Sequence, residues 1–267
     1  MLKTRVIPCL LLEGHGLVKT VQFKNPKYVG DPINAVRIFN EKEVDELILL
    51  DIQATVEKQA PQTKRILEIA SECFMPLCYG GGIRSLDDIG EIFGLGVEKV
   101  SINTYAVENP SFIRSAAERF GSQSIVVAID ARRQPAGKYE VFTYSGKVGT
   151  KLDPVEHAKR MEEMGCGEIF LNSIDRDGTL QGYDIELISQ VSQAVSIPVI
   201  ACGGAGKLSD FREAVELGGA SAVSAGSLLV FHGKHRAVLI TYPSEQELKE
   251  FLQEPIGKGD IIHHMIR

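Results

Sequence analysis

Eight short apolar runs recur along the chain, and each has the composition of a buried β-strand. They are apolar almost throughout instead of alternating with polar residues, which is typical of parallel strands covered on both faces. We predict strands at residues 6–12, 46–51, 77–79, 99–102, 125–130, 168–172, 199–202 and 222–225.

Amphipathic segments of helical period separate these runs. Asp31-Pro32, Asn109-Pro110 and Asp153-Pro154 each place a capping residue before a proline at the first helical position. The strict alternation predicts a parallel α/β fold, and the strand count favours a closed (β/α)₈ barrel, or TIM barrel, over a doubly wound sheet. The predicted helices cover residues 32–42, 63–73, 86–95, 110–120, 154–164, 185–195, 208–217 and 245–252.

The chain also repeats itself at about half its length. Gly80 and Gly203 open matching glycine-rich turns, and 203 − 80 gives an offset of 123 positions. Asp51 and Asp175, at the ends of the second and sixth predicted strands, are 124 positions apart. The repeat predicts two (βα)₄ half-barrels in a single domain over residues 1–267, with boundaries at about 1–120, 121–252 and a short tail at 253–267.

Two connections are long for a barrel. Residues 13–30 form a polar loop that carries Lys19, and residues 131–152 include a small predicted hairpin at 139–144. Long loops in compact domains are often lids. Residues 234–242 fit either a helix extension or an added strand.

Composition excludes several classes of function. The net charge is −6 and no basic block stands out, which argues against nucleic-acid binding. No run approaches the roughly 18 uninterrupted apolar residues of a membrane span, and the N-terminus runs into a strand without a signal peptide. We therefore expect a cytoplasmic protein that binds neither nucleic acid nor membrane.

The cysteines fit a reducing compartment. None forms a C-x-x-C pair, and no histidine lies at metal-ligand spacing from one. We predict reduced core or near-core residues, and neither a metal nor a cofactor; a cysteine nucleophile or a zinc site is the alternative. The five are Cys9, Cys73, Cys78, Cys166 and Cys202.

Polar residues at the carboxyl ends of the strands are the candidates for chemistry, because active sites of such barrels lie there. Asp130 ends an apolar run where desolvation would raise its pKa and suit it to proton transfer. Asp51, Asp175 and Lys19 are further catalytic candidates. The structural alternatives are that Asp130 caps the next turn and that Asp51 pairs with Asp175 or Lys19. The glycine-rich turns predict phosphate sites on both halves of the barrel.

These motifs together resemble the HisF family, the cyclase subunit of imidazole glycerol phosphate synthase. The resemblance runs from the N-terminus to about Leu252. It is carried by residues 5–9 (RVIPC), 80–83 (GGGI), 99–104 (KVSINT), 142–146 (FTYSG), 173–179 (SIDRDGT) and 203–206 (GGAG).

The resemblance implies a barrel that pairs with a HisH-type glutaminase as a heterodimer and accepts its ammonia. The phosphorylated small-molecule substrate would bind through Gly82, Asn103 and Thr104 at one end. At the other end it would bind through Asp177, Gly178, Gly203, Gly204, Gly226 and Ser227. Asp130 matches one of the family's two acid–base aspartates. A charged ring that gates the ammonia path, or has a purely structural role, is matched by Arg5, Glu46, Lys99 and Glu168.

One departure from the family pattern changes the functional prediction. Leu11 occupies the position of the second catalytic aspartate, and Glu13 lies two residues further on. Loss of a general acid or base commonly costs about 10²–10⁴-fold in rate. A missing aspartate beside retained ligand sites resembles divergent HisF-like proteins of bacterial surface-polysaccharide synthesis, in which ammonia serves to convert an acetamido sugar to an acetamidino sugar.

Four functions are compatible with these observations. We prefer an ammonia-conducting synthase subunit of HisF type that serves acetamidino-sugar (lipopolysaccharide, O-antigen) biosynthesis. The second is the cyclase subunit that converts PRFAR and ammonia to imidazole glycerol phosphate and AICAR in histidine biosynthesis. The third is a non-catalytic scaffold that activates a glutaminase, and the last is a single-chain sugar-phosphate isomerase.

Overall fold

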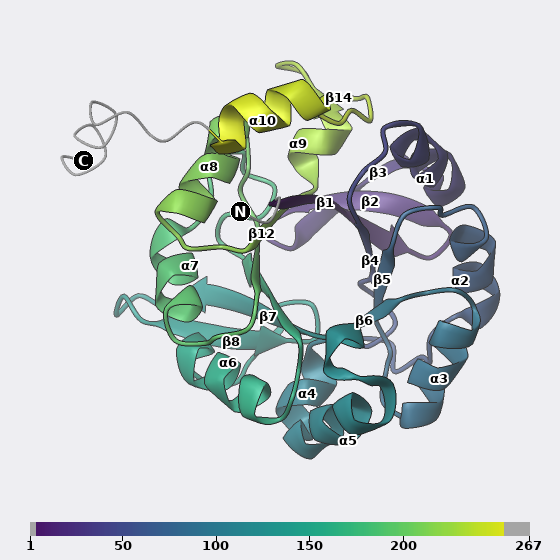
Figure 1. Ribbon diagram of the computed structural model, residues 1–267, viewed down its shortest axis with the longest axis vertical. Helices are drawn as coiled ribbons and strands as arrows, with labels where there is room; N and C mark the ends of the chain where they lie inside the picture. Colours follow the sequence, from purple (N-terminus) through teal and green to yellow (C-terminus); the bar gives the residue numbers. More distant parts are fainter. Residues whose placement is uncertain (1–3, 254–267) are drawn as a thin grey trace.

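The computed structural model describes residues 4–253. Its centre is a closed barrel of eight parallel strands, which confirms the predicted TIM barrel (Figure 1). The last strand pairs with the first, so the barrel has no open edge. In order around the barrel, the strands are β1 (Arg5–Glu13), β4 (Leu47–Asp51), β5 (Leu77–Gly80), β6 (Lys99–Ile102), β7 (Ile125–Arg133), β10 (Glu168–Ser173), β11 (Val199–Cys202) and β12 (Ala222–Ala225).

Helices form a ring around this barrel (Figure 1). The main helices are α1 (Pro32–Glu41), α2 (Thr63–Ala70), α3 (Leu86–Gly94), α5 (Pro110–Phe120), α6 (Pro154–Glu163), α7 (Ile185–Ser192), α8 (Leu208–Glu216) and α10 (Glu245–Gln253). Two short helices, α4 (Thr104–Glu108) and α9 (Ser227–Val230), follow β6 and β12 at the repeat offset, since 227 − 104 is 123. A 3₁₀ turn, Ser122–Ser124, precedes β7.

Two of the three predicted helix caps form. The Asp31 carboxylate accepts the backbone N–H groups of Ile33 and Asn34, and Asp153 does the same at α6. Asn109 occupies the N-cap position before Pro110, as predicted, but its side chain makes no cap hydrogen bond. Its Oδ1 instead accepts the Ser111 hydroxyl at 2.7 Å.

The first long connection is not a loop. β1 continues to Glu13 and pairs antiparallel with β2 (Gly16–Val21), which pairs with β3 (Lys24–Gly30). Gly14 takes φ +58° in the intervening turn, a conformation that glycine adopts without strain. Buried Leu17 and Val18 hold β2 against the barrel. Burial of these apolar side chains therefore makes the segment a strand of the sheet, although many of its other residues are polar.

The second long connection also lengthens a barrel strand. β7 runs on to Arg133 and pairs antiparallel with β8 (Tyr139–Thr143), which pairs with β9 (Val148–Gly149). The predicted hairpin at 139–144 was wrong in detail, because these residues supply one strand of a hairpin rather than both. At residues 234–242 the structure has a strand, β14 (Ala237–Val238), which pairs with β13 (Phe231–His232).

The interior of the barrel is built in layers by strand alternation. Successive inward-facing residues of β1 are Arg5, Ile7, Cys9 and Leu11, since neighbouring strand residues point to opposite faces. The middle layers form a separate apolar cluster inside the barrel: Ile7, Cys9, Ile48, Cys78, Val126, Ala128, Phe170, Ile200, Cys202 and Ala222. Charged residues lie below this cluster and a pocket lies above it.

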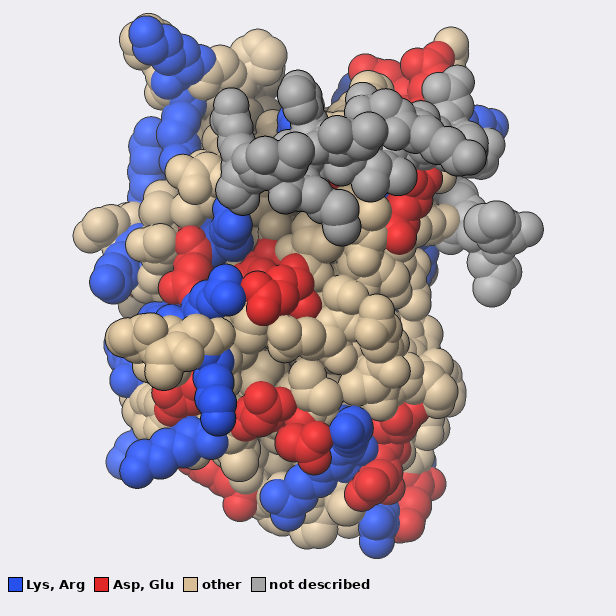
Figure 2. All heavy atoms as spheres, turned by 90° about the vertical axis from the view of Figure 1, so that its left-hand side faces the viewer, with Lys and Arg blue, Asp and Glu red and all other residues tan. Residues whose placement is uncertain are grey.

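Surface chemistry gives little direct indication of a partner. On the face shown in Figure 2, basic and acidic side chains are interspersed rather than gathered into one basic area. Within residues 4–253 no helix has the length and apolarity needed to cross a bilayer. All five cysteines are free thiols, as predicted. The predicted tail lies outside the described residues except for Gln253.

Candidate active site

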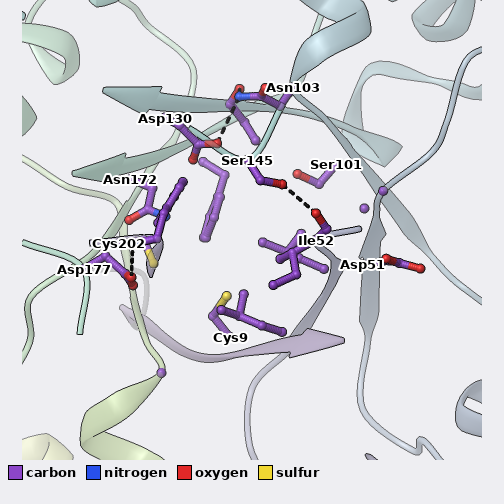
Figure 3. A pocket seen from close by; sticks show the side chains of 18 of the residues that line it. Cys9, Asp51, Ile52, Ser101, Asn103, Asp130, Ser145, Asn172, Asp177 and Cys202 are labelled. Carbon is purple, nitrogen blue, oxygen red and sulfur yellow. Dashed lines mark hydrogen bonds between the residues drawn. The ribbon is translucent and has the colours of Figure 1, made fainter. Parts of the chain in front are cut away.

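A pocket opens at the carboxyl ends of the barrel strands (Figure 3). Every position that the sequence predicted to bind phosphate lines it: Gly82, Asn103, Thr104, Asp177, Gly178, Gly203, Gly204, Gly226 and Ser227. The first three follow β5 and β6, whereas the others follow β10, β11 and β12 across the barrel. The fold therefore brings two candidate phosphate ends to opposite walls of one cavity.

Glycine is required by the geometry of both turns. Gly82 has φ +75°, and a Cβ there would lie 2.7 Å from the carbonyl oxygen of Gln59. Gly203 has φ +90°, and its Cβ would lie 2.6 Å from Asn172 Oδ1. Only glycine lets the backbone pass this close to its neighbours while lining the pocket. The repeated sequence motif thus corresponds to two closely packed turns that only glycine can form without strain.

Asp130 on β7 is the carboxylate best suited to proton transfer. The Asn103 amide donates to its Oδ2 at 3.3 Å (Figure 3). Desolvation, with repulsion from Asp177, raises the pKa of Asp130 to about 7, and a hydrogen bond from Asn172 partly opposes that rise. A group with this pKa can both take and return a proton near neutral pH. This geometry favours a role for Asp130 in proton transfer over a role as the cap of the next turn.

Lys19 reaches the pocket from β2. Its side chain is buried, and its ammonium donates to the backbone carbonyl of Cys9. A Cβ at position 226 would collide with this ammonium, so Gly226 leaves room for it. The lysine therefore places a positive charge beside the second candidate phosphate end.

Asp177 binds the tip of the β2–β3 hairpin, which lies beside the pocket. Its Oδ2 accepts the Thr20 hydroxyl at 2.7 Å and the backbone N–H of Phe23 at 3.3 Å. Desolvation raises the pKa of Asp177, and the hydrogen bond from Thr20 opposes that rise. The hairpin is thereby tied to the turn that follows β10.

Asp51 and Asp175 are placed differently from Asp130. The Asp51 carboxylate accepts backbone N–H groups from Gln53 at 3.0 Å and Ala54 at 2.9 Å, and in Figure 3 it points away from the pocket centre. Burial raises the pKa of Asp51. Asp175 is not among the lining residues, and its carboxylate accepts the Arg133 N–H at 2.7 Å. Asp51 thus stabilises the turn after β4, Asp175 binds the end of β7, and neither forms an ion pair with Lys19.

Leu11 lies in the pocket wall where the resemblance would have placed a second carboxylate. Glu13 does not replace it. The Glu13 Oε1 accepts the Gln53 amide at 2.8 Å, and Glu13 is absent from the lining residues. Among residues 4–253, the aspartates that line this pocket are Asp51, Asp130 and Asp177.

The predicted charged ring closes at the opposite end of the barrel. Arg5 donates to Glu46 at 2.5 Å and to Glu168 at 2.7 Å. Lys99 Nζ lies 3.0 Å from Glu46 and 3.1 Å from Glu168. Each cation thus contacts both carboxylates, so four ion pairs form one alternating ring rather than two separate pairs.

Among the pocket residues that sequence reasoning missed are Asn172, Ser101 and Arg84. Buried Asn172 and Ser101 face the cavity, and Asn172 Oδ1 and Ser101 Oγ have no hydrogen-bond partner in the described part of the chain. Arg84 lines the same cavity beyond the first glycine turn. Asn172 lies two residues after Phe170, and Ser101 lies two residues after Lys99. Residues two apart on a strand face the same side, so this spacing would have indicated both. No group of three or more His, Cys, Asp or Glu in residues 4–253 could hold a metal ion.

Comparison with known proteins identifies the family. A family model described as "Histidine biosynthesis protein" matches residues 5–236. The chain is 59% identical over 248 residues to the imidazole glycerol phosphate synthase subunit hisF2 of Pseudomonas aeruginosa, covering 93% of this chain and 99% of that protein. It is 49% identical over 254 residues to subunit hisF3 of Vibrio vulnificus, covering 95% and 98%.

A third relative is the subunit HisF of Leptospira interrogans, which is 48% identical over 248 residues, covering 92% of this chain and 98% of that protein. The names of all three relatives are provisional assignments. The family match over residues 5–236 spans nearly the whole barrel, from the charged ring to the glycine turns. The chain therefore belongs to the histidine biosynthesis protein family, within its HisF-type subunits of imidazole glycerol phosphate synthase.

Proposed function

We propose that this chain is the ammonia-accepting, lyase-type synthase subunit of a glutamine amidotransferase complex. The observation that carries this proposal is the column of inward-facing side chains inside the barrel. It runs from the charged ring of Arg5, Glu46, Lys99 and Glu168, through the apolar layers, to the pocket that holds Asp130. A column with these three sections suits passage of a small neutral molecule towards a polar site.

The apolar section of the column favours neutral ammonia over the ammonium ion, because the ion loses more on leaving water. A bare ammonium ion would pay a large cost in a layer lined by Ile, Val, Ala and Phe side chains, whereas neutral ammonia pays far less. The ring below offers hydrogen-bonding groups at the entrance, and its closed pairing keeps the charges out of the column. We infer that a HisH-type glutaminase docks at this end and supplies the ammonia.

The pocket would hold a small molecule with a phosphate at each end. Its reacting centre would then lie near Asp130. When ionised, this carboxylate can accept the proton that the nitrogen loses after ammonia has formed its bond to the substrate. Leu11 leaves the pocket without the second acid–base carboxylate at that position. For this reason we propose a paralogue whose ammonia serves acetamidino-sugar synthesis in surface polysaccharides.

A second candidate is supported by a specific observation. Asp130 has a pKa near neutrality and all the phosphate positions line one cavity. These features also suit the histidine-pathway reaction, in which PRFAR and ammonia give imidazole glycerol phosphate and AICAR. In that reaction Asp130 would act as the acid and as the base, and water would take the place of the second acid–base carboxylate.

Glutaminase coupling tests the proposal directly. The chain would be co-expressed with each HisH-type protein of its source organism, and stable complexes would be supplied with amide-¹⁵N-glutamine and PRFAR. Complex formation with ¹⁵N in imidazole glycerol phosphate would establish the histidine-pathway function. A complex that hydrolyses glutamine but leaves PRFAR unchanged would support the paralogue.

Two results would contradict the amidotransferase proposal. The first is that no HisH-type protein binds the chain. The second is a complex whose ammonia escapes to solvent equally fast from the wild-type barrel and from one blocked by Ala222→Trp, because the column would then carry no ammonia. Glutaminase activation without any phosphorylated ligand bound would point to the scaffold function.

A further inference from the structure

One wall of the pocket carries a cation that the phosphate assignment did not include. Arg84 follows the glycine turn after β5 and lines the pocket with Gly82 and Thr104. Its backbone N–H donates to Asp88 Oδ2 at 2.8 Å as part of the α3 capping arrangement. The main chain at this position is therefore held in place, while the half-buried side chain lies along the cavity.

The Arg84 guanidinium has spare hydrogen-bonding capacity. The one hydrogen bond that it makes within residues 4–253 is a long contact, 3.5 Å, from Nη2 to the carbonyl oxygen of Thr55. No carboxylate within residues 4–253 forms an ion pair with it. A guanidinium carries five N–H donors in a planar fork that matches phosphate. Most of these donors are thus free to bind a ligand.

An acidic residue at the same rim is already engaged. Glu108 also lines the pocket, but its Oε1 accepts the Tyr144 hydroxyl at 2.5 Å. Arg84 interacts electrostatically with that tyrosine and lowers its pKa, against the larger raising effect of Glu108. Glu108 is therefore hydrogen-bonded to the Tyr144 hydroxyl and does not form an ion pair with Arg84.

The half-barrel repeat supplies an internal comparison. Lys207 occupies the equivalent position after the second glycine turn, since 207 − 84 is 123. Its side chain is 68% exposed, lies 3.9 Å from Asp210, and is not among the pocket-lining residues. At that end the positive charge in the pocket comes from Lys19 instead. The cation at the first end thus follows the glycine turn, as Arg84, whereas the cation at the second end, Lys19, comes from β2.

We propose that Arg84 is a specificity-determining residue that binds a phosphate group at the end formed by the Gly80–Gly82 turn. The guanidinium would make two parallel charge-assisted hydrogen bonds to one phosphate, while the backbone of the turn approaches from the other side. The ligand then carries a dianionic phosphate at this end rather than a neutral or singly charged group. This inference rests on the proposed function for the existence of a phosphorylated ligand.

Phosphate titration of the isolated barrel tests this assignment. Inorganic phosphate would be added at constant ionic strength, and the backbone amide NMR signals of Gly82 and Gly204 would report on the two ends separately. We expect Arg84→Gln to weaken phosphate binding at Gly82 by about 10- to 100-fold, the value of one charged hydrogen-bonding contact. Binding at Gly204 should stay unchanged.

Two further variants make the result specific. Arg84→Lys keeps the charge but loses the fork, so its affinity at Gly82 should lie between those of the wild type and Arg84→Gln. Lys207→Gln removes the equivalent exposed charge and should change neither end. The three variants also guard against misfolding, because a folding defect in one would alter both reporters.

Several outcomes would overturn the proposal. They are equal phosphate affinity at Gly82 in the wild type and Arg84→Gln, no titration of Gly82 in the wild type, or equal loss at both ends. The barrel is tested without a glutaminase, so failure of the amidotransferase function would leave an Arg84-dependent phosphate site intact. Conversely, a coupled complex with no effect of Arg84→Gln would refute only the inference.

Discussion

Leu11 and Leu50 lie side by side in the wall of the pocket, because β1 and β4 pair in parallel with these two residues in register. This apolar pair occupies the place where proton transfer would require a second carboxylate. The pocket is therefore asymmetric, with Asp130 on one wall and leucines on another.

Restoring a carboxylate should change activity. We expect Leu11→Asp to gain ammonia-dependent turnover of PRFAR by about 10²–10⁴-fold, the usual effect of a general acid or base. The half-buried charge should cost about 1–3 kcal/mol of stability. Steady-state rates with saturating ammonia would measure the gain. Leu11→Asn is the matched control, because it is polar without being a proton-transfer group; an equal gain in Leu11→Asn would refute the acid–base explanation.

Asp130 should make stability depend on pH. Its folded pKa of about 7 lies above the ordinary 3.8, so the folded state binds the extra proton and stability falls as pH rises from about 4 to 7. Above pH 7 the penalty is complete, at up to about 4 kcal/mol. Asp130→Asn should remove this dependence and be more stable than the wild type at pH 8.

Urea unfolding at pH 5 and pH 8 would measure this effect. Asp87→Asn is a suitable control, because the Asp87 side chain is 93% exposed and should leave the pH dependence of the wild type unchanged. Parallel stability curves for the wild type and Asp130→Asn would contradict the raised pKa.

Asn172 should tune the acidity of Asp130. Its hydrogen bond favours the ionised carboxylate, so Asn172→Leu should raise the pKa of Asp130 above about 7. The same substitution removes the unpartnered Oδ1, which offsets much of the lost hydrogen bond in stability. A ¹³C NMR titration of labelled aspartate would follow the carboxyl group, with Asp130→Asn identifying its signal. An unchanged or lowered pKa would show that Asn172 does not hold the carboxylate.

The charged ring should respond to charge balance rather than to single residues. Glu46→Gln leaves Arg5 and Lys99 sharing one carboxylate, and we expect a loss of about 3 kcal/mol in the free energy of unfolding. Glu46→Gln combined with Lys99→Gln restores the balance and should recover a large part of that loss. Chemical denaturation of Glu46→Gln, Lys99→Gln and the double variant would decide. If the double variant is less stable by the sum of both single effects, the four residues do not act as a ring.

Local sequence signals were sufficient for the barrel and for much of the pocket. Continuous apolar runs such as 125–130 are typical of parallel strands buried on both faces, and the 123-residue repeat placed Gly80 and Gly203 at matching turns. Because the carboxyl ends of such strands meet at one face, Asn103 and Asp177 were brought to the same pocket without any knowledge of their contacts.

Tertiary structure decided which polar residues at that face can act. Asp51 ends β4, Asp130 lies within β7 and Asp175 follows β10. Only the carboxylate of Asp130 combines a place in the pocket with hydrogen bonds from side-chain amides alone. The other two accept backbone N–H groups, Asp51 from the turn that follows it and Asp175 from Arg133 at the end of β7. A strand period of two fixes which face a residue points to, but not which neighbour its side chain reaches, since that depends on strand register and on turns distant in sequence.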